Sequence, residues 1–358
     1  DVNYADYDWD GDGEVDQVIY IAAGFCGNQV KTGYIWPNTG GLYPSVRMGG
    51  NVVVNFASIS CELWRDATSC GIGTICHEFT HCLGIPDIYP TASNEGFSVV
   101  DEWDIMDGGN YTNKGWCPPN FSALEKMLLG WKSPVELTDE TVITGMKPVS
   151  EGGDTYIIRN PGYEDEFYLI ENRQQSGWDY ASPGNGLLIF HVDYDRELWS
   201  SNKVNTSRYH YRYNLFNADG KVYSDWDLRG DGSDWSKYTM DDWMRNRYLS
   251  TSTFPYRNDS LTVDQLTDDS DPAATLFNKN IDGSLFMSKP ITGIQMSADG
   301  TISFSFNTHT AINRPSDAVS PKPVAYYDLN GCRLPSAPSG PGIYILRYTD
   351  GTTRKVIR

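Results

Sequence analysis

The sequence predicts an α+β protein with a mixed first domain, a β-rich, sandwich-like second domain and a short β tail. The first observation is that two expected helices, one with helical apolar spacing and one with a capping box, lie among strand-like runs in residues 1–134. The second is that residues 135–310 contain strand-like runs separated by turn residues. The third is a linker-like stretch, residues 311–323, that precedes a last segment, residues 324–358.

The first domain is expected to form strands and two helices. Its expected strands are residues 17–22 and 52–56. The first helix covers about residues 70–83. The residues at helical spacing that form its expected buried stripe are Ile72, Ile75, Phe79 and Leu83. The second helix opens with a capping box at Ser122 and Glu125 and ends near Gly130.

The second domain is expected to be built from strands and long loops. Its expected strands are residues 155–159, 167–172, 186–192 and 302–306. The stretch 195–285, rich in Asn, Asp, Tyr and Ser, is interpreted as elaborated loops with a few short elements. Long loops of this kind usually have a function, so we expect them to border a functional cleft or to hold ions.

The stretch HEFTHCLGIPD, which begins at His77, is the most informative pattern in the chain. On a helix, His77 and His81 lie about 40° apart and one turn along, so both imidazoles can reach one ion. Glu78 lies on the same flank, where it can act on a metal-bound water without being a ligand. This is the HExxH arrangement of zinc proteases. Gly84 ends the helix and can present Asp87 as a third ligand.

A second loop and the chemistry of the ligands support a catalytic zinc site. Met106 lies in the loop DIMDGG and is followed by turn-forming residues, as expected of a Met-turn beneath a zinc ion. Three protein ligands leave a fourth position for water, which distinguishes a catalytic zinc site from a closed structural one. The ion lowers the pKa of that water, and Glu78 takes its proton and later delivers it to the leaving amine.

The seven cysteines are not expected to bind this ion. Cys76 and Cys82 flank the two histidines but lie about 240° apart around the helix, so both cannot join the histidines on one ion. They are interpreted as packed thiols or disulfide halves. Cys61 and Cys70 are plausible disulfide partners, and Cys332 is the thiol expected to remain unpaired because the number is odd.

The chain resembles the secreted metallopeptidases of the immune inhibitor A type, which are metzincin-like zincins. The resemblance rests on HEFTHCLGIPD, DIMDGG, FSALEKMLLGW (121–131), EFYLIENRQ (166–174), GLLIFHVD (186–193) and the acidic loop DYDWDGDGEVD (6–16). It covers roughly residues 1–310, and the stretch 195–285 matches only loosely. Members of the family usually carry more chain before the acidic loop. The opening elements are therefore expected to have been removed, or the domain is incomplete.

The resemblance implies a zincin-like catalytic domain in residues 1–134. The implied zinc ligands are His77, His81 and Asp87. Glu78 is the implied catalytic base, and Met106 is the Met-turn residue. Tyr111 is interpreted either as a hydrogen-bond donor to the oxyanion, as in some metzincins, or as a surface aromatic. His191 lies in an apolar strand pattern and is expected to be a buried structural histidine.

The acidic loop near the start of the chain predicts a calcium site. Its carboxylates follow the D-x-D-x-D-G spacing, with Gly13 after the third aspartate. The expected calcium ligands are Asp8, Asp10, Asp12, Glu14 through its backbone carbonyl, and Asp16. The last position of an EF-hand loop would fall on Ile19, which cannot ligate, so the loop is not a complete EF-hand. The alternative is a solvated acidic turn, which is also the interpretation of residues 225–234.

Composition restricts the class of partner. The formal net charge of −19 and the pI near 4.5 argue against nucleic acid and anionic membrane surfaces. In the sequence given, no apolar run is long enough to span a bilayer and no stretch has the pattern of a signal peptide, as expected of a mature or trimmed form. Residues 326–358 resemble the C-terminal sorting domains of type IX secretion, and a small β module of unknown role is the alternative. Both interpretations predict a secreted or cell-surface protein.

Two functions remain open. The first is a zinc endopeptidase that cleaves extracellular or host proteins, including glycoproteins. The second is a catalytically inactive binding module on the same fold, whose aromatic loops bind glycans or glycoproteins. The intact HExxH motif favours the enzyme, because a decayed site is expected to lose its base.

Overall fold

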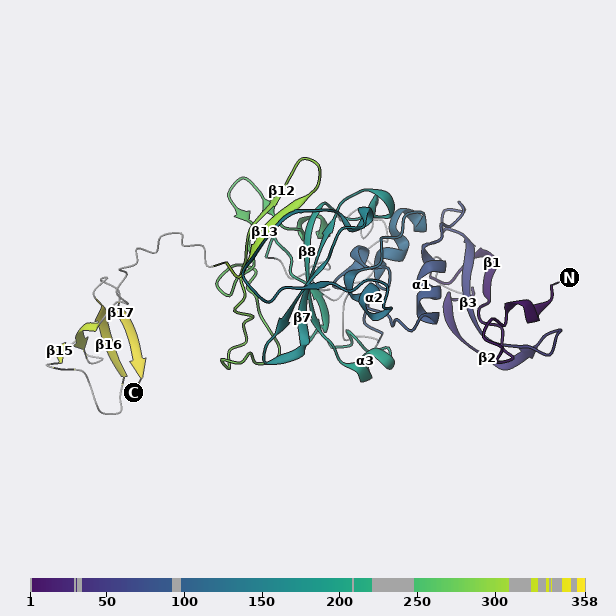
Figure 1. The fold of residues 1–358 in the computed structure, drawn as a ribbon, viewed down its shortest axis with the longest axis horizontal. Coiled ribbons are helices and arrows are strands. Elements are labelled where there is room, and N and C mark those ends of the chain that lie inside the picture. Colours follow the sequence, from purple (N-terminus) through teal and green to yellow (C-terminus); the bar gives the residue numbers. More distant parts are fainter. Residues whose placement is uncertain are drawn as a thin grey trace. The chain divides into compact units, whose positions relative to one another are not determined.

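The computed structural model of the chain divides into two compact units, Asp1–Thr308 and His309–Arg358 (Figure 1). The residues that it describes are 2–28, 30, 34–91, 98–207, 209–220, 248–308, 323–327, 333–334, 336, 343–348 and 353–357. Both helices and several sheets are present, which confirms the α+β class. Across these described ranges, no helix has the length and apolar character needed to cross a membrane.

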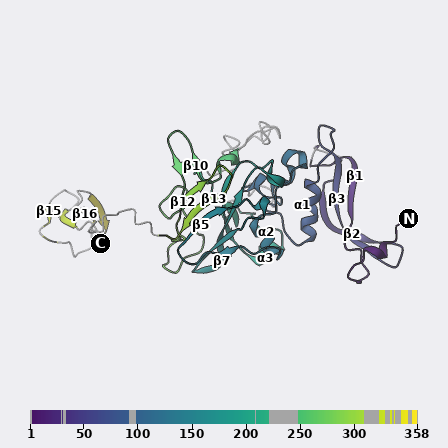
Figure 2. The ribbon, with the colours of Figure 1, turned by 45° about the horizontal axis from the view of Figure 1, so that its top comes forward.

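The first sheet of the larger unit packs against the helix that contains the HExxH motif. Its strands are β1 (Ile19–Phe25), β2 (Asn38–Arg47) and β3 (Val53–Leu63), in the order β1-β3-β2. β1 runs parallel to β3, and β2 runs antiparallel to it. Helix α1 (Gly73–Cys82) lies beside β3 (Figure 2). The sequence predicted β1 and β3 but not β2, which contains Gly40, Gly41 and Pro44, residue types that are depleted in strands.

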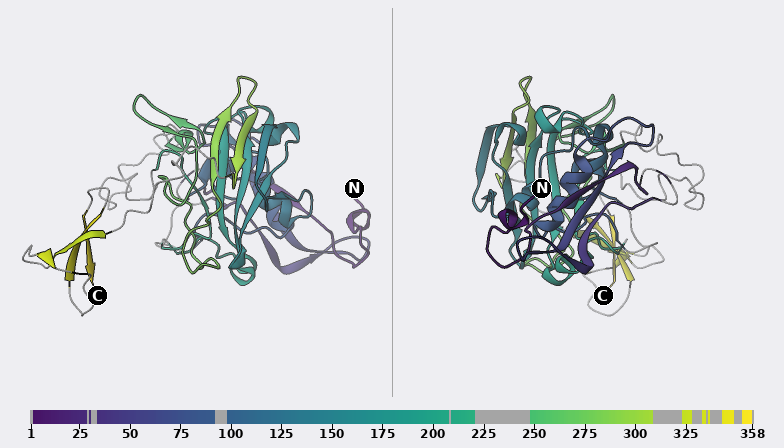
Figure 3. Two further views of the ribbon diagram at one scale, coloured as in Figure 1. Left: turned by 60° about the vertical axis from the view of Figure 1, so that its left-hand side comes forward. Right: turned by 90° about the vertical axis from the view of Figure 1, so that its right-hand side faces the viewer.

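The second sheet is the central layer of the larger unit. Its strands are β4 (Val135–Glu136), β6 (Tyr156–Asn160), β7 (Tyr163–Arg173), β8 (Gly186–Asp193) and β9 (Tyr213–Leu215), in the order β4-β6-β7-β8-β9. A third sheet, in the order β12-β13-β5, packs on one of its faces (Figure 3). The strands of that third sheet are β5 (Thr141–Met146), β12 (Ile291–Met296) and β13 (Ile302–Phe306).

Both faces of the central sheet are buried, because successive side chains of a strand point to opposite faces. Leu169 of β7 and Phe190 of β8 contribute to one core, which also contains the loop around Met106. Ile170 and Ile189 point the other way, into a core shared with β5, β12 and β13. All eight residues of β8 are buried as a result. The predicted strands in this region are confirmed, and the two face-to-face sheets form the sandwich-like part of the chain.

The boundary predicted at Pro134 stays a prediction. Residues on both sides of it contribute to the same core: Trp103 and Leu124 come from before it, and Leu188 and Tyr213 from after it. The two parts of the chain are therefore packed against each other through fully or nearly fully buried apolar side chains.

Helix α1 is confirmed, but its predicted buried stripe is wrong. Ile72 and Phe79 are 42% and 39% exposed, and Ile75 and Leu83 are only half-buried. The helix instead buries Gly73, Thr74, His77, Glu78 and Thr80. The periodicity rule assumes that the buried face is apolar, whereas this helix turns its polar, functional face toward the rest of the molecule.

The second helix, α2 (Ala123–Leu128), begins with the predicted capping box. The Ser122 hydroxyl accepts a hydrogen bond from the backbone N–H of Glu125, and the Glu125 carboxylate accepts one from the N–H of Ser122. The Glu171 carboxylate of β7 accepts a further hydrogen bond from the first helical N–H, that of Ala123, at 3.0 Å. A carboxylate at a helix N-terminus is favourable, so this contact ties α2 to the central sheet.

The loop-rich stretch 195–285 contains short elements where it is described, and residues 221–247, including the acidic stretch 225–234, lie outside the described residues. Its elements are α3 (Arg196–Ser200), β9, η7 (Tyr248–Thr251), β10 (Tyr256–Arg257) and β11 (Thr262–Val263). The short 3-10 helices elsewhere are η1 (Tyr4–Tyr7), η2 (Asp101–Trp103), η3 (Gly108–Gly115), η4 (Val149–Glu151) and η5 (Gly177–Asp179).

The smaller unit is a four-stranded antiparallel sheet in the order β15-β14-β16-β17. Its strands are β14 (Pro323–Tyr327), β15 (Arg333–Leu334), β16 (Ile343–Tyr348) and β17 (Thr353–Ile357). The prediction of a β tail agrees with this sheet. Cys332 and most of the predicted linker lie outside the described residues.

Candidate metal centre

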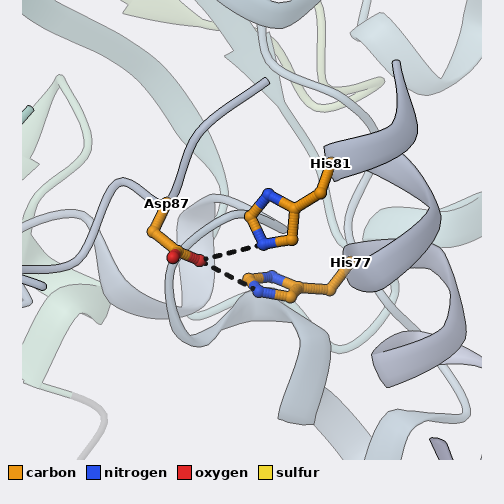
Figure 4. Close-up of side chains that lie close together, drawn as sticks. All are labelled: His77, His81 and Asp87. Carbon is orange, nitrogen blue, oxygen red and sulfur yellow. Dashed lines mark ion pairs between the residues drawn. The ribbon is translucent and has the colours of Figure 1, made fainter. Parts of the chain in front are cut away.

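Helix α1 and the turn after it bring the three predicted zinc ligands together. The Nε2 atoms of His77 and His81 each lie 3.2 Å from Oδ1 of Asp87 (Figure 4). The two imidazole centroids are 4.9 Å apart, as expected for residues one helical turn apart. Gly84, with φ of 90°, occupies the left-handed region that favours glycine and turns the chain back toward the helix.

The second ring nitrogen of each histidine is held by a backbone carbonyl. Nδ1 of His77 lies 2.7 Å from the carbonyl oxygen of Ile105, and Nδ1 of His81 lies 2.8 Å from that of Ile85. A carbonyl oxygen can only accept, so Nδ1 donates in both rings. In the neutral tautomer this leaves the lone pair on Nε2, which is the form that binds a metal ion.

The donor set suits a zinc ion. The ligand atoms of His77, His81 and Asp87 lie within 4.8 Å of one another, and two nitrogens with one carboxylate oxygen are a common set for catalytic zinc. Two buried carboxylate oxygens at this place, Oδ1 of Asp87 and Oε2 of Glu78, have no hydrogen-bond partner among the residues that the structure describes. A buried carboxylate oxygen without a donor is costly, so both point to a group that the protein itself does not supply.

The pKa values of the two carboxylates are shifted in opposite directions. Burial raises the pKa of Glu78, and the nearby His77 and His81 only partly oppose this change. Burial also acts to raise the pKa of Asp87, but its interactions with the two imidazoles outweigh it and hold that pKa below its usual range. Asp87 is therefore suited to remain an anionic ligand, while Glu78 is suited to gain and lose a proton.

The loop around Met106 forms the floor of the site. Met106 is fully buried, and its backbone N–H donates to Oδ1 of Asp104 at 2.8 Å. Its carbonyl oxygen accepts a hydrogen bond from the N–H of Ile88, the residue after Asp87. The N–H of Gly109 donates to the carbonyl of Asp104 and closes the loop. These bonds fix the carbonyl of Ile105 beneath His77.

The predicted ligands line a cavity with a volume of about 600 Å³, and two tyrosines also border it. Tyr111, predicted from the sequence, accepts a hydrogen bond from the Asn28 amide at 3.3 Å, and burial raises its pKa. Tyr89, which the sequence analysis missed, stacks on the His77 ring at 6.3 Å with an interplanar angle of 18°. The sequence feature that could have identified Tyr89 is its position, two residues after Asp87.

The remaining predictions in this part of the chain concern His191 and four cysteines. His191 is buried, with Nε2 2.7 Å from Oε1 of Glu166, which confirms the structural interpretation. The thiol sulfurs of Cys61 and Cys70 are 3.9 Å apart and both cysteines are free in this structure, so the expected disulfide between them is not formed here. Cys76 and Cys82 are not part of the ligand group.

Three of the five predicted calcium residues gather in the acidic loop. Carboxylate oxygens of Asp8, Asp10 and Asp12 lie within 4.8 Å of one another. The loop is folded by backbone N–H groups that donate to these carboxylates, such as that of Gly11 to Asp8 at 2.8 Å. Asp16 is outside this group of three, and its Oδ2 accepts a hydrogen bond from the backbone N–H of Trp9 in the same loop at 2.6 Å. Glu14 donates its N–H to Oδ1 of Asp12 at 2.8 Å.

One family comparison covers the metal centre. Residues 48–132 match the family model described as the immune inhibitor A peptidase M6 catalytic domain. The matched segment contains α1, Asp87, the Met106 loop and α2, and it is less than half of the chain. A search of the curated proteins finds no match. The family match supports a metallopeptidase of the immune inhibitor A type, which is a hydrolase acting on peptides or proteins.

Proposed function

We propose that the chain is a secreted or cell-surface, zinc-dependent endopeptidase with a zincin-like catalytic fold. The observation that carries the proposal is the convergence of the His77 and His81 Nε2 atoms on one carboxylate oxygen of Asp87, with both Nδ1 atoms fixed by carbonyls. The family match over residues 48–132 supports the peptidase class.

Each residue of the site has a separate role in the proposed reaction. His77, His81 and Asp87 would hold the ion, which when bound supplies Lewis acidity and lowers the pKa of a water molecule. Glu78 is 5% exposed and takes the proton of the attacking water on its carboxylate. It then delivers that proton to the leaving amine. Tyr111, on the wall of the same cavity, is assigned as the hydrogen-bond donor to the carbonyl oxygen that becomes negative.

The substrate is proposed to be an extracellular or host protein, including glycoproteins. The cavity is lined by Trp36, Tyr89 and Trp199 as well as by the metal ligands. The net charge of −19 agrees with an extracellular protein that avoids anionic surfaces. The tail, residues 324–358, is proposed to act as a type IX sorting domain.

The test is digestion of an unstructured protein by the full chain and by Glu78→Gln, with zinc measured in both. Glu78→Gln keeps the shape of the side chain but removes the base. We expect equal zinc content and a loss of at least about 100-fold in cleavage rate. Equal cleavage by both proteins would refute the assignment of Glu78. Zinc binding without cleavage by either would favour the alternative, an inactive zincin-fold module that binds glycans or glycoproteins.

A further inference from the structure

The third metal ligand is held by a residue that lies far from the family-matched segment. The side-chain amide nitrogen of Asn202 donates to Oδ2 of Asp87 at 2.8 Å. The amide oxygen of the same side chain accepts from the backbone N–H of Asp87 at 2.7 Å. One side chain therefore fixes both the carboxylate and the backbone of the ligand. Asn202 follows α3 and is separated from Asp87 by 115 positions.

The backbone of Asn202 is itself fixed. Its φ is 57°, in the left-handed region that asparagine tolerates better than most residues. Its N–H donates to the carbonyl of Trp199 at 3.2 Å, and its own carbonyl accepts from the hydroxyl of Thr91 at 2.6 Å. The buried Asn205 amide makes a parallel contact, donating to the carbonyl of Ile88 at 3.0 Å. The segment after α3 thus clamps the segment that carries the third ligand.

The two oxygens of Asp87 have different surroundings. Oδ2 accepts the hydrogen bond from Asn202, whereas Oδ1 faces the Nε2 atoms of His77 and His81 at 3.2 Å. Oδ1 has no hydrogen-bond donor within the described part of the chain. An amide donor on one oxygen leaves only the other oxygen suited to a metal ion.

We propose that Asn202 is the positioning residue that makes Asp87 a ligand through Oδ1 alone. This inference rests on the proposed function, because it requires the zinc site. Ligation through one oxygen preserves a coordination position for water, which a carboxylate binding through both oxygens would occupy. Hydrogen-bonded partners of metal ligands contribute about 10–100-fold to metal affinity.

Two substitutions at Asn202 distinguish its contact with Oδ2 of Asp87 from its contact with the backbone N–H of Asp87. Asn202→Gly removes both contacts and keeps a residue that accepts the positive φ. Asn202→Asp keeps an acceptor for the N–H of Asp87 but replaces the donor to Oδ2 with a second carboxylate. The matched control is Ser201→Ala, an exposed position in the same turn. None of these changes removes a metal ligand.

The measurement is the zinc dissociation constant, from competition with a chromogenic chelator, together with the visible spectrum of the cobalt(II)-loaded protein. We expect about 10–100-fold weaker zinc binding in both Asn202 variants, and no change in Ser201→Ala. The cobalt band is expected to weaken as Asp87 becomes able to bind through two oxygens and the coordination number rises. Unfolding of the chelator-treated proteins serves as the check for a purely structural role.

The outcomes distinguish this inference from the proposed function. Zinc affinity within twofold of the unmodified protein in both variants would overturn the role of Asn202 and leave the peptidase intact. Weaker binding in Asn202→Gly alone would overturn the assignment to Oδ2, because only the contact to the backbone would matter. Weaker binding in both variants, with cleavage that does not depend on Glu78, would refute the proposed chemistry and support Asn202. Failure of the unmodified protein to bind zinc would overturn both.

Discussion

Replacing Gly73 with alanine should damage the metal centre without touching a ligand. Gly73 is the first residue of α1, and a Cβ atom there would lie 2.0 Å from the carbonyl oxygen of Asn110 and 2.9 Å from its carbonyl carbon. Ordinary contacts at a Cβ atom begin at 3.4 Å, so the helix and the loop must separate by roughly 1.4 Å. Both obstructing atoms belong to the backbone, which cannot rotate away as a side chain would.

Gly73→Ala is expected to lower both the unfolding free energy and the affinity for zinc. Overpacking of this kind destabilises by about 1–3 kcal/mol, and the helix propensity of alanine offsets at most about 1 kcal/mol of it. The separation also stretches the 2.7 Å contact between Nδ1 of His77 and the carbonyl of Ile105, because the loop with Ile105 continues into Asn110. We therefore expect a net loss of about 1–2 kcal/mol in unfolding free energy and about tenfold weaker zinc binding.

The assay is urea unfolding of the chelator-treated protein, followed by zinc competition on the folded protein. The control is Gly49→Ala, where a Cβ atom meets nothing within 4 Å. That variant should be neutral or slightly more stable. An unfolding free energy within about 0.5 kcal/mol of the unmodified protein, with zinc affinity unchanged, would refute the close-packing argument.

Three further predictions concern the metal sites and the oxyanion. His81→Ala should abolish zinc binding at about one ion per chain, as measured by elemental analysis, and undiminished zinc would refute the ligand set. Asp10→Ala combined with Asp12→Ala should lower the midpoint of thermal unfolding only when calcium is present, and an equal drop in chelator would contradict a calcium site. Tyr111→Phe should lower kcat by about 100-fold with little change in KM. The matched variant Tyr89→Phe tests whether the tyrosine beside His77 has that role instead, and unchanged kcat in Tyr111→Phe would remove Tyr111 from the mechanism.

The ligands could be predicted from the sequence because the geometry that joins them is local. His77 and His81 are one helical turn apart, and Gly84 brings Asp87 back within a few residues. The capping box at Ser122 was equally accessible, since both of its hydrogen bonds lie within one turn. Local spacing therefore predicted which side chains come together wherever the chain needed no distant partner.

What failed were inferences that depend on surroundings. Ile72 and Phe79 have helical apolar spacing, yet they are exposed, because the helix turns His77 and Glu78 toward the interior. Asn202 carries no local signal at all, since its role depends on a contact across 115 positions. The role of the Ile105 carbonyl likewise cannot be predicted from the sequence. Every residue has a backbone carbonyl that can accept a hydrogen bond, and only the fold determines which one lies beside His77.

The β-rich part of the larger unit is a component of the metal centre rather than an attachment to it. Leu169 and Phe190 of the central sheet belong to the same buried core as Met106, so the Met106 loop and that sheet are parts of one packed cluster. Deeper in the same layer, the fully buried Arg173 pairs with Glu171 at 2.9 Å, and Glu171 in turn accepts from the first N–H of α2. Asn202 then reaches the third ligand from beyond β8. Since a buried charge that loses its partner costs about 3–5 kcal/mol, changes at Arg173 should propagate to the Met106 loop through α2 and the shared core. The geometry of His77, His81 and Asp87 is thus determined by residues on both sides of Pro134, although the HExxH motif lies on only one of them.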